Sequence, residues 1–240
     1  MPAPLIEAAV ETVACAVAAV RAGAGRLELC ADLARGGVTP SSGMIRAARA
    51  AVDVPLMVLI RPRPGDFVYA TVERQVMRED IREARRAGAN GVVVGALTVG
   101  GLVDQATMGE LIDAADGLEV VMHRAVDQAR DILAACEALL ALGVQRVLTS
   151  GGAPSALQGG EAIAALVERF GGRVDIMAGG QIRADNVRQI LRLTGVDAVH
   201  LGPRRRVGPA GMGERDELDI EQLAAVVRLS RAALETTGEP

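Results

Sequence analysis

The chain has 240 residues, half of them hydrophobic, and 26 basic against 30 acidic side chains give a net charge of −4. This balance gives no general reason to expect nucleic-acid binding, so a small neutral or anionic ligand is the expected partner. The 26 basic residues are all arginine, which excludes Schiff-base catalysis by a lysine and a phosphate-binding loop built on one.

Short apolar runs alternate along the chain with longer stretches of helical spacing, as they do in successive βα units. Eight such units can be counted. The predicted strands are Leu5–Val10, Arg26–Leu29, Leu56–Ile60, Gly91–Val94, Glu119–Met122, Arg146–Leu148, Asp175–Met177 and Ala198–Leu201. The predicted helices are Thr12–Ala22, Ser42–Val52, Val72–Ala87, Asp104–Ala115, Asp131–Leu142, Ser155–Phe170, Asn186–Thr194 and Asp219–Leu234.

The eight units predict an α/β fold of the closed (β/α)8 TIM-barrel type, which we favour over an open doubly wound sheet with extra units. The length suits one domain, and no stretch has the composition of an interdomain linker. We therefore expect a single domain over residues 1–240. A segment rich in Gly and Pro at about 202–218, before the last helix, is expected to be irregular and to form a flap over one end.

The three cysteines, Cys15, Cys30 and Cys136, are too few and too scattered for a disulfide framework, and a reducing compartment suits them. The first residues lack the basic region of a signal peptide, and no apolar run approaches the roughly twenty residues of a spanning helix. We expect a cytoplasmic protein that binds no membrane. The arginine-rich outer helices fit a monomer and a homodimer equally well.

Polar side chains lie at the predicted strand ends, where a TIM barrel places its active site. They are Glu7, Glu28, Arg61, Arg63, Asp66, His123, Arg124 and His200. Three of them belong to the stretch Arg61–Tyr69, whose prolines and glycine predict a rigid loop. Charged groups on such a loop are candidates for ligand binding.

Four of these side chains are candidates for acid/base catalysis: Glu7, Glu28, Asp66 and His123. Period-two alternation places Glu28 toward the barrel axis, where a buried carboxylate must be paired or protonated. It could act as a general acid or base, or form a structural ion pair with an arginine such as Arg61. His123 and His200 could each shuttle protons, bind a metal or simply fill the barrel with a hydrogen-bonded ring.

Glycine turns follow the sixth and seventh strands and would expose backbone N–H groups to a phosphate. Arginine adds bidentate anion recognition. The predicted anion-binding residues are Arg61, Arg63, Arg124, Ser150, Gly151, Gly179, Gly180 and His200. The run Arg204–Arg206 could clamp an anion or be solvated.

Taken in order, these motifs resemble the CutC family, which is named for copper homeostasis and adopts the TIM-barrel fold. The resemblance spans most of the chain and rests on Arg26–Cys30 with Gly36–Ser41, Ile60–Tyr69, His123–Ala125 with Asp127, Arg146–Gly151 and Met177–Gly180. It implies copper as a ligand, bound in the family by a first-strand cysteine together with a second cysteine that Cys30 matches. The first-strand region here, Glu7–Val10, has no thiol.

The sequence therefore supports two candidate functions. The resemblance implies copper binding in copper homeostasis, with Cys30 as the soft ligand and His123 or His200 assisting. Because Cu(I) prefers at least two soft ligands, one thiolate would need help from Met, His or a second chain. The clustered carboxylates, imidazoles and guanidinium groups favour instead a barrel enzyme that acts by acid/base chemistry on a small anionic or phosphorylated metabolite. An inactive barrel that serves as a scaffold is the third reading.

Overall fold

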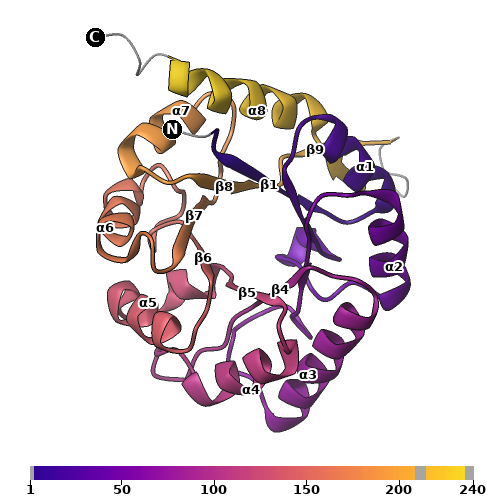
Figure 1. Cartoon of the computed structure of the whole chain (residues 1–240), viewed down its shortest axis with the longest axis vertical. Helices are drawn as coiled ribbons and strands as arrows, with labels where there is room; N and C mark the ends of the chain where they lie inside the picture. The colour runs from indigo at the N-terminus through magenta and orange to yellow at the C-terminus, as the bar shows by residue number, and fades with distance from the viewer. Residues whose placement is uncertain (1–2, 209–214, 236–240) are drawn as a thin grey trace.

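The computed structural model describes residues 3–208 and 215–235, which contain a closed barrel of eight parallel strands (Figure 1). The strands are β1 (Leu5–Val10), β2 (Arg26–Leu29), β3 (Leu56–Leu59), β4 (Gly91–Val94), β5 (Glu119–Met122), β6 (Arg146–Thr149), β7 (Asp175–Gly179) and β8 (Ala198–Leu201). Each strand pairs with its neighbour in the sequence, and β8 pairs with β1 to close the ring. The predicted TIM barrel is confirmed.

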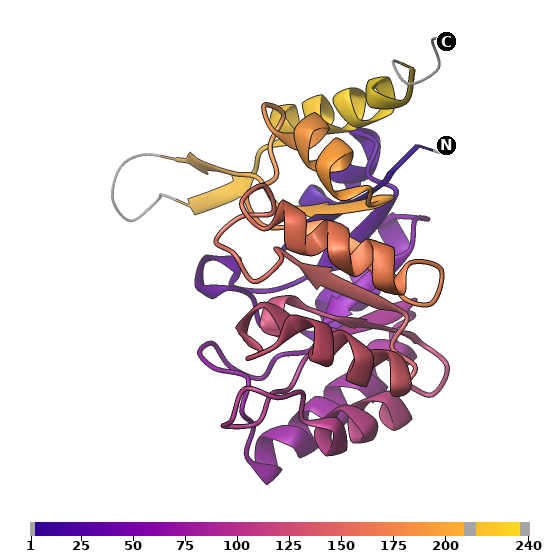
Figure 2. The ribbon, with the colours of Figure 1, turned by 90° about the vertical axis from the view of Figure 1, so that its left-hand side faces the viewer.

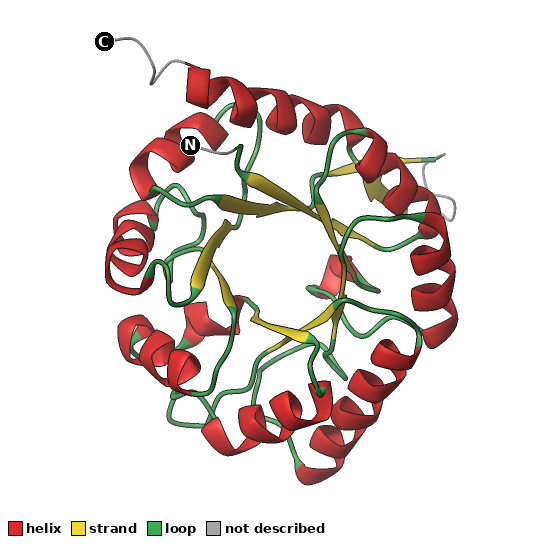
Figure 3. Cartoon of the chain, in the orientation of Figure 1, coloured by secondary structure: helices red, strands yellow, loops and turns green. Residues whose placement is uncertain are grey.

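Eight helices form a ring outside the strands (Figure 3). They are α1 (Val13–Arg21), α2 (Ser42–Ala51), α3 (Thr71–Arg86), α4 (Gln105–Ala115), α5 (Ile132–Ala141), α6 (Gly160–Phe170), α7 (Val187–Thr194) and α8 (Ile220–Glu235). Five of them begin at a side chain that accepts a backbone N–H: Thr12, Ser41, Asp104, Asp131 and Asp219. Such caps satisfy amides that the first turn leaves unpaired. None of the helices in the described part is long and apolar enough to cross a membrane.

The structure departs from the sequence prediction at α6, which begins five residues later than expected. Residues 155–159 form turns, and the Ala156 N–H donates to the Gly180 carbonyl at 3.0 Å. This bond joins the loop after β6 to the loop after β7. Residues 155–159 therefore connect two loops at the barrel mouth and do not extend the helix. Two short 3-10 helices, η1 (Leu33–Arg35) and η2 (Arg124–Gln128), were also not predicted.

The segment at about 202–218, expected to be irregular, contains an antiparallel hairpin instead. Its strands are β9 (Arg204–Val207) and β10 (Arg215–Leu218), and the hairpin projects from the end of the barrel at which the strands finish (Figure 2). Arg206 lies opposite Asp216, at 3.6 Å from it, and opposite charges across a strand pair favour pairing. The remaining residues of the predicted flap, 209–214, lie outside the described residues.

The barrel interior is filled by side chains at alternate strand positions, mainly Met57, Leu59, Val93, Val121, Leu148 and Met177. A second, larger apolar cluster separates the strands from the helices. Because few aromatic residues are available, both layers consist mainly of aliphatic side chains and methionine, and the larger cluster adds Tyr69 and Phe170. The apolar interior leaves two polar layers, one where the strands begin and one where they end.

Replacing Gly91 by alanine should destabilise the fold by about 1–3 kcal/mol, the cost of overfilling a packed core. A Cβ at this inward position would lie 2.0 Å from Met57 Cε and 2.6 Å from the Glu119 carbonyl oxygen. Urea unfolding followed by circular dichroism measures the change. The control is Gly109→Ala in α4, where a Cβ meets nothing within 4 Å, and we expect a gain of up to about 1 kcal/mol from helix propensity. Equal stabilities for the two variants would contradict this packing of the interior.

Candidate functional site

Glu7, Glu28 and His200, from β1, β2 and β8, meet inside the barrel. Glu7 and His200 are register partners, and Glu7 Oε1 lies 2.8 Å from His200 Nδ1. Glu28 Oε2 lies 3.5 Å from His200 Nε2, too far for a strong hydrogen bond. The two glutamates are 1% and 5% exposed. The imidazole therefore lies between two buried carboxyl groups, bonded closely to one and loosely to the other.

The surroundings move the pKa values of the two carboxyl groups apart. Burial raises the pKa of Glu28 to about 7, and the nearby Glu7 charge adds to that effect while His200 opposes it. Burial acts on Glu7 as well, but the hydrogen bond and charge of His200 and the charge of Arg26 outweigh it, so its pKa is lowered. Near neutral pH, Glu7 is ionised and Glu28 exchanges its proton readily. Unequal carboxyl pKa values are the usual arrangement for acid/base work.

His200 also gains affinity for a proton from this arrangement. Burial alone would lower its pKa, yet the hydrogen bond to Glu7 and the charges of both glutamates raise the pKa above its ordinary value. The Glu7 carboxylate thus fixes the ring and favours the imidazolium. The other ring nitrogen, Nε2, has Glu28 Oε2 at 3.5 Å as its partner within the described residues.

Charged side chains at the start of the strands hold Glu7 in place. Arg26 Nε donates to Glu7 at 2.5 Å, and its Nη1 crosses the barrel to both oxygens of Glu119 at 2.7 and 2.9 Å. Arg146 lies 3.4 Å from the same Glu119 and donates to Asp175 at 2.9 Å. Sequence reasoning missed Arg26, although its position two residues before Glu28 on the same strand face was a usable signal.

The same three side chains could in principle hold a metal ion, since one ligand atom from each lies within 4.8 Å of the others. Carboxylate and imidazole ligands suit divalent ions rather than Cu(I). An ion would have to displace the hydrogen bond between Glu7 and His200, and Arg26 already supplies a positive charge beside Glu7. The geometry fits a proton relay better than a metal centre.

A cavity of about 340 Å³ lies at the mouth of the barrel, next to His200. Three arginines line it, Arg124, Arg183 and Arg204, together with Gly180 and Gly202. Arg204 is paired with Glu11. The cavity is thus bordered by β7, β8 and positive charge, which is where TIM barrels commonly bind phosphate.

Asp127 positions Arg124 at this cavity, and sequence reasoning did not assign it a role. It accepts from Arg124 Nε at 2.9 Å, from the Ser150 amide at 3.0 Å and from the Gly152 amide at 3.1 Å. Arg124 also donates to Ser150 Oγ at 2.8 Å. The Gly151 amide donates to Thr149 at 2.8 Å. The amides of the turn after β6 are therefore already bonded within the protein, and the turn supports Arg124 instead of offering free donors.

Gly179 and Gly180 have a steric role at the same mouth. A Cβ on Gly179 would lie 2.5 Å from Leu148 Cδ1. Gly180 has a φ of +105°, and a Cβ there would lie 3.4 Å from Arg124 Cζ. The positive φ favours glycine at position 180, and a Cβ there would also lie 3.1 Å from Ser150 Cβ.

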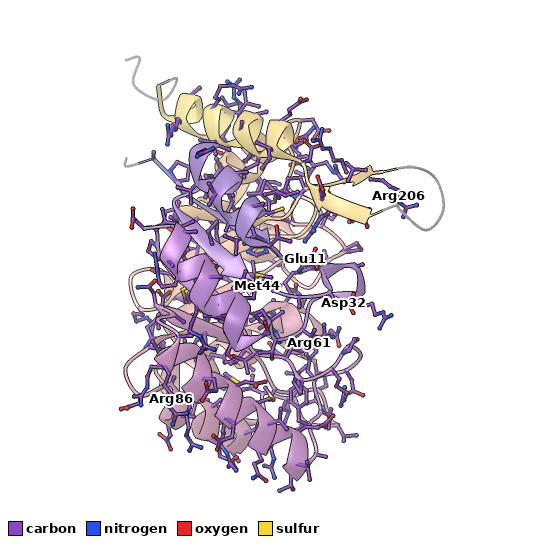
Figure 4. All side chains as sticks on the ribbon, turned by 90° about the vertical axis from the view of Figure 1, so that its right-hand side faces the viewer. Glu11, Asp32, Met44, Arg61, Arg86 and Arg206 are labelled. Carbon is purple, nitrogen blue, oxygen red and sulfur yellow. The ribbon has the colours of Figure 1, made fainter. Side chains whose placement is uncertain are left out.

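Arg61 is buried, but it does not pair with Glu28, which lies beside His200. Its Nη1 donates to the carbonyls of Gly36 and Gly37, both at 3.1 Å, and its Nη2 donates to the carbonyl of Gly65 at 2.7 Å. The guanidinium ties the loops after β2 and β3 together. Figure 4 shows Arg61 at the end of the barrel that carries the hairpin with Arg206.

His123 lies at the end of β5, 7% exposed, and its ring centroid is 4.9 Å from that of Phe67. Its Nδ1 accepts the Ala125 N–H at 3.1 Å. Burial and the nearby Arg61 charge lower the pKa of His123 to about 3. The ring is therefore neutral near pH 7, which suits a hydrogen-bonding role more than proton transfer.

Arg63 and Asp66 bond to one another at 3.0 Å, and Arg63 also bonds to Glu73 at 2.5 Å. The Asp66 side chain is largely exposed. The structure does not bring this pair together with Glu28 and His200.

Cys30 lies inside the barrel wall and is 1% exposed. Burial and the charge of Glu28 raise the pKa of this thiol well above its ordinary value. Cys15 and Cys136 belong to the outer helices α1 and α5. Within the described residues, the one cluster of side chains suited to metal binding does not include Cys30.

Comparison with known proteins shows similarity over most of the chain. The CutC family model matches residues 4–204. This range contains Glu7, Glu28 and His200 and the residues that line the cavity at the mouth. A CutC family protein of Xylella fastidiosa (strain 9a5c) is 44% identical over 234 residues, 93% of this chain and 88% of the relative. The Mus musculus copper homeostasis protein cutC homolog is 44% identical over 200 residues, 83% of this chain and 74% of the relative. A crystal structure of CutC from Streptococcus agalactiae gives a TM-score of 0.78 at 35% identity, covering 82% of this chain and 97% of that chain.

Replacing Glu28 by glutamine should change how stability depends on pH. The folded state raises the pKa of this carboxyl from 4.5 to about 7, so its contribution to stability is present below 4.5 and is lost as pH rises to about 7. Without this group, the stability of the variant relative to the original protein should rise by roughly 3 kcal/mol from acid to mildly alkaline pH. Urea unfolding across that range measures it.

The control for this measurement is Glu7→Gln, because the folded state lowers the pKa of Glu7. The contribution of Glu7 is present at high pH and is lost as pH falls. The relative stability of this variant should therefore decrease as pH rises. The same trend in both variants would contradict the separation of the two carboxyl groups.

Proposed function

The chain belongs to the CutC family, and from this premise we propose that it takes part in copper homeostasis, as the mouse relative is named, by acid/base chemistry on a small anionic ligand. The observation that carries the proposal is the buried series Glu7–His200–Glu28 beside a cavity lined by arginines. We also propose a cytoplasmic location, because the three cysteines are unpaired thiols and a reducing compartment keeps them so.

In this proposal the anionic group of the ligand binds at the mouth of the barrel. Arg124 and Arg183 line the cavity and supply charge-assisted hydrogen bonds. Asp127 and Ser150 hold Arg124 at 2.9 and 2.8 Å, so the guanidinium loses little freedom when a ligand binds. A prepositioned cation reduces the entropy cost of binding.

His200 is the acid/base that meets the ligand, because it lines the cavity and Glu28 does not. Glu7 orients the ring through Nδ1 and stabilises the imidazolium, as a carboxylate does behind a catalytic histidine. Nε2 then gives or takes the proton of the ligand. Glu28, whose pKa is about 7, accepts or returns a proton at the same side of the ring.

Binding at the mouth can be tested with a thermal-shift screen of phosphorylated and carboxylated metabolites. A ligand stabilises the folded state in proportion to the logarithm of its concentration over its Kd. Arg124→Gln should weaken the affinity of each active compound by about tenfold or more, the value of a hydrogen bond to a charged group. The control is Arg86→Gln, since Arg86 lies at the other end of the barrel, bonded to Glu83 (Figure 4).

Proton transfer can be followed separately on any compound that binds. Proton NMR in D2O should show deuterium entering the ligand with the original protein and no exchange with Glu28→Gln or His200→Gln, although binding is kept. A screen without any stabilising anion, or exchange that is unchanged in both variants, would refute the proposed chemistry.

Direct copper binding is the second candidate, and the names of the relatives favour it. Cys30 is a single buried thiol whose pKa is raised, whereas copper binding requires the thiolate. We therefore expect the protein to lose Cu(I) to a competing chelator, with no difference between Cys30→Ala and the control Cys136→Ala. Retention of one Cu(I) per chain that depends on Cys30 would establish the copper site instead.

A further inference from the structure

Among the buried donors that have no partner within the described residues are two that lie beside one aromatic ring: His123 Nε2 and Arg61 Nε. The two side chains contact the same aromatic ring, because Arg61 Cζ lies 4.9 Å from the Phe67 centroid and the His123 ring lies 4.9 Å from it. Buried polar atoms are nearly always hydrogen-bonded. Two unpartnered nitrogens beside one ring therefore indicate a binding partner that the chain itself does not supply.

The hydrogen bonds of His123 determine where its proton lies. Nδ1 accepts the Ala125 N–H and cannot carry a proton at the same time. The neutral ring therefore has its proton on Nε2, which makes this nitrogen a donor. The low pKa of about 3 means that the ring stays neutral at physiological pH.

Arg61 adds a positive charge that no side chain neutralises. Its Nη atoms bond to three backbone carbonyls, and no carboxylate of the described residues forms an ion pair with it. A buried charge is costly unless an opposite charge accompanies it. The acceptors near Arg61 are these carbonyls and the Tyr69 hydroxyl, all of them neutral. The site thus has two unpartnered donors and one positive charge, and its complement is an anionic oxygen.

We infer that Arg61, Phe67 and His123 form a second binding subsite, which takes a carboxylate oxygen of the ligand. The inference rests on the proposed function and narrows its substrate class to small carboxylic acids that carry another anionic group for the arginine mouth. Phe67 is half-buried and lies against both donors, so the carboxylate reaches them when this ring turns aside. His123 acts here as a neutral hydrogen-bond donor.

The chain contains two histidines, so nitrogen NMR of histidine-labelled, full-length protein resolves both rings. His123 should show the Nε2–H tautomer with no change across the neutral pH range. Adding acetate or phosphoglycolate should shift the His123 Nε2 signal, whereas inorganic phosphate should leave it in place. A proton on Nδ1, or a His123 signal that ignores both carboxylates, overturns the inference.

Two substitutions separate binding from packing. His123→Phe keeps an aromatic ring beside Phe67 and removes the donor, while His123→Gln keeps an N–H near the position of Nε2. Calorimetry should show phosphoglycolate binding weakened by about tenfold or more in the first variant and by much less in the second. Inorganic phosphate should bind both variants as it binds the original protein.

The outcomes distinguish this inference from the proposed function. If phosphate binds through Arg124 but His123→Phe leaves phosphoglycolate affinity unchanged, the carboxylate subsite is refuted and the mouth remains. If acetate shifts His123 while phosphate binds nowhere, the subsite is supported and the proposed anion site fails. If neither anion binds, both are refuted.

Discussion

The site depends on the buried carboxylate of Glu7, which is hydrogen-bonded to His200 and ion-paired with Arg26. Glu7 is 1% exposed, and an ionised carboxylate at that depth requires compensating charge. Arg26 supplies it and is itself balanced by Glu119, which connects β1 to β5 across the barrel. Removing either partner would leave a buried charge unpaired, so this ion network and the closed barrel support each other.

Burying several charged groups together also makes their pKa values differ. Arg26 and His200 favour the ionised form of Glu7, and burial leaves Glu28 with a pKa of about 7. The lowered pKa of Glu7 and the raised pKa of Glu28 therefore come from one network. The proposed acid/base role of His200 therefore depends on the charges buried where the strands begin.

Two arginines and a neutral histidine border the mouth, and they differ in how the protein holds them. Arg124 is bound by a carboxylate and remains 43% exposed, which suits an anion from solvent. Arg61 is bound by carbonyls and covered by Phe67, which suits a group that enters after the ring moves. His123 is neutral, and its Nε2–H has no hydrogen-bond partner within the described residues. The proposal of a small ligand with two anionic ends rests on this arrangement.

The sequence by itself determined the barrel and most of its polar candidates. Eight short apolar runs with intervening helical periods predict the (β/α)8 fold, and alternation places Glu28 inside it, because both depend on periods of two and 3.6 residues along the chain. The resemblance to the CutC family was likewise carried by local motifs.

Only the tertiary structure decided which candidates meet. Glu7 and His200 are 193 residues apart, and they become partners because β8 closes on β1. In the folded barrel Glu28 lies beside His200 and not beside Arg61. Arg63 pairs with Asp66 on a surface loop, and Arg124 pairs with Asp127. Pairing across a closed sheet and desolvation depend on contacts distant in sequence, which no local pattern records.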